Sequence, residues 1–175
     1  MTDHHLLSAP ERLARYTDDD KAEILGDLTD PFGVAALGLT WLPKDEHFGI
    51  RLAGRLVAHT GLLRLPVTVG ELETEVMGVG GVAVAPDLRG RGLARAVLGA
   101  ALDHARTLGP PYGLLFCRPE LVPLYGRLGW RPVPGEVEVR QPGGVVVMPI
   151  RTLWTPLREG VEWPEGAVRL RSLPM

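Results

Sequence analysis

The sequence has few of the residues that disulfide-rich, metal-binding or nucleic-acid-binding proteins rely on. It contains one cysteine among 175 residues, which permits neither an internal disulfide nor a cysteine-rich metal site. The histidines His4, His5 and His47 lack metal-ligand spacing, so we expect no metal. The formal charge of −2 gives no reason to expect nucleic acid, which usually needs a strongly basic face.

Long hydrophobic runs are also missing. No apolar run reaches the roughly 18 residues of a membrane span. The first residues show neither the basic region nor the apolar region of a secretory signal. We therefore expect a cytoplasmic protein without a membrane partner. Apolar residues nevertheless make up 45% of the chain, enough for a packed core. A length of 175 residues suits a single domain spanning residues 1–175.

The first half of the chain predicts a short helix followed by strands. Thr17 and Asp20 have the spacing of a helix-capping pair, and Ile24, Leu25 and Leu28 would form the buried face of that helix. Residues 47–52 and 55–65 read as two strands around a tight hairpin at 53–54. We expect residue 66, a proline, to end the second strand at a bend or an edge.

The second half alternates strands and helices. Residues 71–84 read as a long strand in which Gly80-Gly81 favours a bulge. The remaining predicted strands are residues 112–117, 136–140 and 145–150, and the remaining predicted helices are 92–108 and 121–128. The strand at 112–117 would return parallel to the long strand by a right-handed crossover. The fold class is therefore α/β, with a single mixed sheet.

The stretch from Gly81 to Ala94 carries the strongest functional signal. A strand (Val82, Ala83, Val84) stops at Pro86, a loop with two glycines follows, and a helix begins at once. The first amides of a helix have no acceptor within the helix and favour an anion. Gly90 and Gly92 allow the backbone to approach a phosphate closely, and Arg89 and Arg91 add charged donors. The pattern predicts a site for a phosphorylated cofactor, although such a loop is often only a turn.

Two other phosphate motifs are excluded. A P-loop ends in Gly-Lys-Ser/Thr, and the chain contains no such tripeptide. The dinucleotide fingerprint needs a small residue three positions after its second glycine. Starting from Gly90 and Gly92 that position holds Arg95, and starting from Gly78 and Gly80 it holds Ala83, which opens no helix.

The segment Arg89-Gly90-Arg91-Gly92-Leu93-Ala94 resembles the acetyl-coenzyme A motif of the GNAT superfamily of N-acetyltransferases. Leu124-Tyr125-Gly126-Arg127-Leu128-Gly129-Trp130 is similar to a later motif of that superfamily. Residues 58–64 resemble the nodulation-factor N-acyltransferases. The aminoglycoside 2′-N-acetyltransferases are a second similar group, and that resemblance also draws on residues 162–166. The resemblance implies a mostly antiparallel sheet flanked by helices, in which a splayed strand pair holds acetyl-CoA. The implied cofactor-binding residues are Val82, Ala83, Val84, Arg89, Gly90, Arg91, Gly92, Leu93 and Ala94.

The resemblance also implies catalytic residues. Pantetheine would pair with the backbone of Val82 and Val84 like an added strand, and Tyr125 would protonate the leaving thiolate; packing in the core is the alternative role for that tyrosine. In the aminoglycoside relatives, a glutamate at the position of Gly80 serves as the catalytic base. Glu75 lies too far along the strand to replace it directly, so His59 is the better candidate for a base, although a lone histidine in a strand is usually structural.

Other reactive side chains are expected to be structural. Cys117 has no base nearby in the sequence and reads as a small hydrophobic residue, and Asp87 reads as a turn residue. Residues 133–175 would form a hairpin and tail that contribute to the acceptor site. There, Trp154 and Trp163 would line the acceptor site or pack in the core. At one aligned tail position Arg169 would repel a polycationic aminoglycoside.

Three functions remain open. The first is acetyl transfer from acetyl-CoA directly to a primary amine of a small molecule. The second is transfer of a longer acyl chain, for which Gly80 and Gly81 would leave room. The third is a sensor or interaction domain that binds acyl-CoA without catalysis. An exposed edge at the closing hairpin would permit a homodimer.

Overall fold

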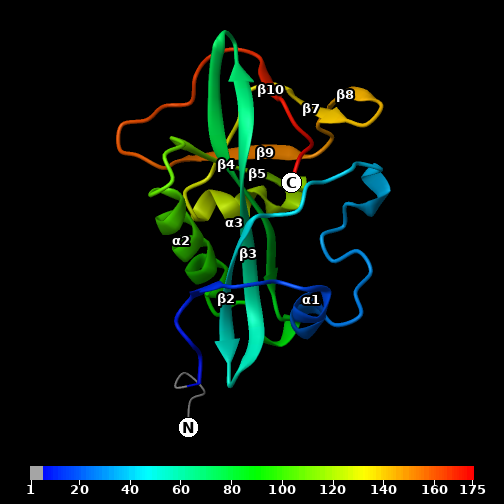
Figure 1. Cartoon of the computed structure of the whole chain (residues 1–175), viewed down its shortest axis with the longest axis vertical. Helices are drawn as coiled ribbons and strands as arrows, with labels where there is room; N and C mark the ends of the chain where they lie inside the picture. The colour runs from blue at the N-terminus through cyan, green and yellow to red at the C-terminus, as the bar shows by residue number, and fades with distance from the viewer. Residues whose placement is uncertain (1–5) are drawn as a thin grey trace.

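A single mixed sheet organises the chain in a computed structural model that describes residues 6–175 (Figure 1). The initial His4 and His5 lie outside the described residues. The main path of the sheet runs β6-β9-β5-β4-β3-β10-β7-β8, and β2 pairs with β3 and β1 beside it. Among the strands of residues 6–175, only β4–β5 and β10–β7 pair in parallel, which confirms the mixed, mostly antiparallel sheet. The strands are β1 Glu11–Leu13, β2 Glu46–Leu52, β3 Arg55–Val69, β4 Leu72–Val84, β5 Tyr112–Cys117, β6 Arg131–Pro132, β7 Val137–Gln141, β8 Gly144–Val147, β9 Arg151–Pro156 and β10 Val168–Leu170.

In the part of the chain that the structure describes, three α-helices accompany the sheet: α1 Asp18–Leu25, α2 Leu93–Ala105 and α3 Val122–Arg127. The 3-10 turns are η2 Ala35–Leu37, η3 Pro86–Leu88 and η4 Pro119–Leu121. None of the helices in the described part of the chain has the length and apolar character needed to cross a membrane.

Helix α1 begins as expected and ends earlier. Thr17 and Asp20 form a reciprocal capping box, and Ile24 and Leu25 are buried. The prediction that Leu28 belongs to the buried face is wrong, because its side chain is 54% exposed. The reason is Gly26, which adopts a positive φ of 65° and donates to the Ala22 carbonyl, so that the helix stops there.

Strand β3 corrects a second expectation. It continues through Pro66 to Val69, so the proline neither ends nor bends the strand. The carbonyl of Pro66 accepts from the Arg171 N–H, beyond the end of β10. The N and C=O of one strand residue point to the same side. The ring nitrogen of Pro66 therefore also points away from β4, and the lack of an N–H there removes no hydrogen bond between β3 and β4.

The C-terminal third holds more strands than the pattern predicted. The hairpin of β7 and β8 is present, but β8 ends at Val147 rather than at residue 150. The following residues form β9, which pairs with β5 along its whole length. The short β10 lies between β3 and β7. Strands β1, β6, β9 and β10 were not predicted, since three of them have only two or three residues.

Helices α1 and α2 cover opposite faces of the β2–β3–β4 sheet. Phe48 of β2 pairs with Thr60 of β3 and contacts His104 of α2, while the next β3 residue back, His59, stacks on Tyr16 just before α1. Neighbouring strand residues point to opposite faces. In Figure 1, α2 and α1 accordingly flank the long β3–β4 ribbon. We call the side of His59 and Tyr16 the α1 face.

Candidate functional site

A bulge in β4 marks the site. The pairs Ala58–Val84 and His59–Ala83 share one register, whereas Gly61 pairs with Gly80 in a register shifted by one residue. Thr60 therefore faces two residues of β4, and one of them, Gly81, adopts a φ of +61°. Such a conformation disfavours residues with a Cβ. The predicted glycine bulge is present.

Strands β4 and β5 separate next to this bulge. Their parallel ladder runs from Val76–Tyr112 to Gly78–Leu114 and then stops. The N–H of Ala85 donates to the Val57 carbonyl on β3. Because the N–H and C=O groups of successive strand residues point to opposite sides, those of Val84 and Val82 point away from β3, toward β5. Beyond Gly78 these groups face the splay between the two strands and can take an added strand.

The glycine loop follows β4 at the open end of the splay. Gly90 and Gly92 have φ values of +79° and +78°, and a Cβ at either position would meet no atom within 4 Å. Gly92 caps α2, and Arg89 and Arg91 are exposed beside it, whereas Leu93 is buried. The loop therefore presents free amides, open space and two cations, which fits the diphosphate of an acyl-CoA.

An ion pair anchors this loop to the sheet. Arg55, at the start of β3, lies 3.1 Å from Asp87, and its hydrogen bond lowers the pKa of the Asp87 carboxyl. Both side chains are exposed, so the pair positions the turn and adds little stability. The carboxylate of Asp87 is engaged by Arg55 and holds the turn, so it acts as a turn residue.

Tyr125 and Cys117 lie on the β5 side. Tyr125, on α3, is 8% exposed and belongs to the same core cluster as Cys117 at the end of β5. Burial raises the pKa of the Tyr125 phenol to about 12 and that of the Cys117 thiol to about 11. Both groups are protonated at neutral pH. A phenol in that state can donate a proton, whereas a thiol in that state is a poor nucleophile.

His59 lies at the bulge with both ring nitrogens engaged. Its Nδ1 is 2.8 Å from the Gly81 carbonyl, and its Nε2 is 3.0 Å from Nδ1 of His47. A carbonyl only accepts, so Nδ1 carries the proton and donates it to Gly81, and Nε2 accepts from His47. Burial lowers the pKa of His59 to about 4. The imidazole therefore holds the bulge directly, and it reaches no substrate proton except through His47.

Lys44 is the side chain that sequence reasoning missed. It lies in the segment between α1 and β2, on the α1 face, against the directly paired glycines Gly61 and Gly80. Burial and the charge of Lys21 lower its pKa to about 8. One signal was available: Lys21 and Lys44 are the only lysines of the chain.

The segment carrying Lys44 borders both sides of the splay. Trp41 packs edge-on against Phe116 of β5, with ring centroids 6.4 Å apart. The C-terminal region holds the segment in place: Leu42 N–H donates to the Pro174 carbonyl at 2.6 Å, and Gln141 exchanges hydrogen bonds with the backbone of Thr40.

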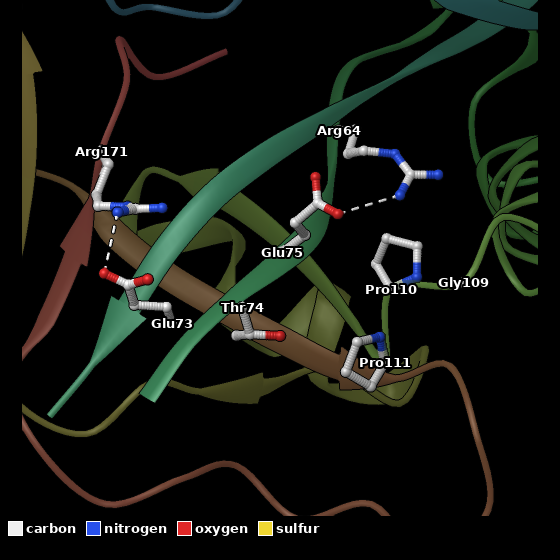
Figure 2. Close-up of a pocket in the computed structure, with 8 residues that line it drawn as sticks. All are labelled: Arg64, Glu73, Thr74, Glu75, Gly109, Pro110, Pro111 and Arg171. Carbon is white, nitrogen blue, oxygen red and sulfur yellow. Dashed lines mark hydrogen bonds and ion pairs between the residues drawn. The ribbon is translucent and has the colours of Figure 1, made fainter. Parts of the chain in front are cut away.

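Glu75 lies in a different place. It forms an ion pair with Arg64, 3.2 Å apart, and lines a charged depression with a second pair, Arg171–Glu73 (Figure 2). Glu75 pairs with Pro66 on the part of β4 that precedes the splay. The tryptophans Trp154 and Trp163 pack with Tyr112 at the start of β5, in the second core cluster.

The sequence profile of the Acetyltransferase (GNAT) domain family matches residues 38–133. That range contains the bulge, the splay and the glycine loop. The chain belongs to the GNAT acetyltransferase family. This membership confirms the predicted family.

Individual relatives agree with this assignment. Nodulation protein A of Bradyrhizobium sp. (strain NC92) is 31% identical over 132 residues, which are 68% of this chain and 62% of that protein. The chain thus spans less than two thirds of this relative.

Solved structures show the same fold. One is the GNAT family N-acetyltransferase YhbS of Escherichia coli in complex with CoA, with a TM-score of 0.59 at 18% identity. The match covers 93% of this chain and 90% of the YhbS chain. A GNAT acetyltransferase of Brucella melitensis, in complex with acetyl-CoA, has a TM-score of 0.52 at 18% identity, over 91% and 94% of the two chains. The α/β fold with its curled mixed sheet is confirmed.

Proposed function

We propose that this acetyltransferase moves an acetyl group from acetyl-CoA directly to a primary amine of a small molecule. One observation carries the proposal: β4 and β5 part after the Gly78–Leu114 pair, and the free backbone edge beyond it leads to the glycine loop. Acyl-CoA bound along that edge would have its diphosphate at Arg89–Ala94 and its pantetheine beside Val82, Ala83 and Val84. Fixing the thioester next to the amine supplies much of the rate.

We further propose Tyr125 as the general acid. Its phenol, with a pKa raised by burial to about 12, stays protonated and can give its proton to the departing thiolate. His59 is proposed as a positioning residue, because its Nδ1–H holds the carbonyl of Gly81. The base role expected for it from sequence would operate only through His47. The acceptor site is proposed on the α1 face, bordered by residues 39–45 and held by the region 133–175.

Thermal unfolding with and without ligand tests cofactor binding. Acetyl-CoA at a hundred times its dissociation constant should add about 2.7 kcal/mol to stability, a Tm increase on the order of 5–10 °C for a chain of this size. A larger increase with a long-chain acyl-CoA would favour a longer acyl group, which would have to displace Lys44 from Gly80 or His59 from Gly81. No increase with either ligand would refute the proposed site.

Thiol release with a panel of small amines tests catalysis. Tyr125→Phe should lower kcat by about 10²-fold or more, as loss of a general acid does, without changing the affinity for acetyl-CoA. Tyr112→Phe is the matched control. Like Tyr125, Tyr112 is buried, but it lies on β5 and packs against Trp154 and Trp163. Ligand binding without thiol release in the wild type would instead indicate a non-catalytic acyl-CoA sensor.

A further inference from the structure

We propose that Lys44 is the proton acceptor for the incoming amine, a role that β4 cannot supply because Gly80 has no side chain at that point. The inference rests on the proposed amine acetylation and names the group that completes it. It is argued from the position of Lys44 on two glycines, from the direction of β4 and from the charges that face the ammonium.

The side chain of Lys44 lies in a trough made by two glycines. Gly61 of β3 and Gly80 of β4 pair directly across the ladder. A Cβ built at Gly61 would lie 2.6 Å from Cγ of Lys44, and one built at Gly80 would lie 2.7 Å from its Cε and 3.1 Å from its Nζ. The stem therefore crosses β3 and its amine ends over β4. Any other residue at these positions would displace it.

The direction of β4 places this amine at the reacting end of the splay. The glycine loop that fits the diphosphate follows Val84, so a ligand entering there passes first Val84 and then Val82. The bulge at Gly81 follows, and Gly80 lies just beyond it, two residues past the last β4–β5 pair at Gly78. The thioester end of an extended ligand would arrive there, beside Nζ of Lys44.

Burial and neighbouring cations favour the neutral form of Lys44, while the Met175 oxygen, 3.7 Å from the Cβ position of Gly80, is an acceptor on the same side. Burial lowers the pKa of Lys44 to about 8, and the charge of Lys21 on α1 acts in the same direction. His47 on β2 and His59 on β3 face the same region, and burial lowers the pKa of both imidazoles. Asp45, the next residue, raises the pKa of His47. A lysine tuned in this way holds a useful fraction of free amine near neutral pH.

The proton balance of the reaction is complete. Lys44 takes one proton from the substrate ammonium and returns it to solvent after turnover. The neutral nitrogen then bonds to the acetyl carbon, and the carbon–sulfur bond breaks. The second proton lost from nitrogen on amide formation replaces the one that Tyr125 gives to the thiolate. No other reactant is required.

A titration of the lysines tests the placement without any acceptor substrate. Protein labelled with [ε-¹³C]lysine gives two signals, because the chain contains only Lys21 and Lys44, and Lys21→Arg assigns them. We expect the Lys44 signal to titrate near 8 and to shift when CoA is added. Gly80→Ala should push Nζ outward and move its midpoint toward the ordinary lysine value of about 10.4. An ordinary midpoint in the wild type, or no response to CoA, overturns the proposal.

Two substitutions separate a proton acceptor from a binding charge. Thiol release is measured from acetyl-CoA with n-propylamine, ethanolamine, glucosamine and spermidine. Lys44→Met and Lys44→Arg should both lower kcat/KM by about 10²-fold or more and abolish its rise with an apparent pKa near 8, with acetyl-CoA affinity unchanged. Arginine keeps the charge but does not lose its proton. Full activity in Lys44→Arg would show that the charge alone matters and would overturn the proposal.

Failure of the proposed function has a different signature. A wild-type protein that binds acetyl-CoA but releases no thiol with any of the four amines contradicts the proposed amine acetylation itself, whatever Lys44 does in the titration. Acetylation of Lys44 by acetyl-CoA, seen by mass spectrometry as a stable +42 Da adduct (the mass of one acetyl group), would make Lys44 an acceptor and would overturn its role as a base.

Discussion

The buried imidazole of His59 predicts that the protein loses stability in weak acid. Its side chain is 2% exposed, and burial lowers its pKa from 6.5 to about 4 in the folded state. Between these values the unfolded chain binds a proton that the folded chain does not. Stability from this residue is therefore complete above pH 6.5 and is lost as the pH falls toward 4.

The size of the effect follows from the shift. A difference of about 2.5 pKa units corresponds to about 3 kcal/mol at 1.36 kcal/mol per unit. For a chain of this size that amounts to a decrease in Tm of about 6–12 °C. Urea unfolding followed by circular dichroism at pH 7.0, 6.0, 5.0 and 4.0 measures it as a change in the free energy of unfolding.

A variant isolates the contribution of His59. His59→Phe keeps an aromatic ring for the stack on Tyr16 but cannot titrate, and it loses the hydrogen bond to Gly81. We expect it to be less stable than the wild type at pH 7 and to have a much flatter dependence between pH 6.5 and 4. His104→Gln, on the opposite face, should retain the wild-type slope that His59 causes. Equal slopes in His59→Phe and the wild type would refute the reasoning.

Three further predictions concern the loop and the sheet edge. Gly92→Ala places a Cβ at a φ of +78°, so it should lower the free energy of unfolding by about 1–2 kcal/mol and weaken CoA binding measured by calorimetry. The control is Gly99→Ala inside α2, whose Cβ would meet no atom within 4 Å and which should leave CoA binding unchanged. Arg89→Gln and Arg91→Gln should each weaken CoA binding about tenfold at low salt and less at high salt. We propose that the edge strand β8, with Val146 37% exposed, pairs two copies; Val146→Lys should then convert a dimer to a monomer in light scattering, and a wild-type monomer would contradict this.

Local chemistry explains why much of the site was predictable from sequence. Gly81, Gly90 and Gly92 stand where the chain needs a positive φ, and all three lie within twelve consecutive residues between a β-branched strand and a helix. The bulge, the loop and the cap of α2 therefore follow from neighbouring residues. The expected end of β3 at Pro66 failed because the sequence does not show which side of a strand faces a partner. That side depends on β10, more than a hundred residues later.

The side chains that fill β4 on the α1 face could not be predicted in the same way. Gly78, Gly80 and Gly81 leave that stretch of strand without side chains of its own, and each is covered by a residue from elsewhere. Met175 lies over Gly78, Lys44 over Gly80 and His59 against Gly81. The local pattern shows where a side chain is absent, whereas the residue that takes its place is set by tertiary packing. The sequence therefore predicts His59 of β3 as the base, since the nearest acid on β4, Glu75, is on the far part of the strand, whereas the amine nearest to Gly80 comes from a segment 36 positions earlier in the chain. A strand of small residues in this fold is thus better examined for what packs onto it than for what it carries.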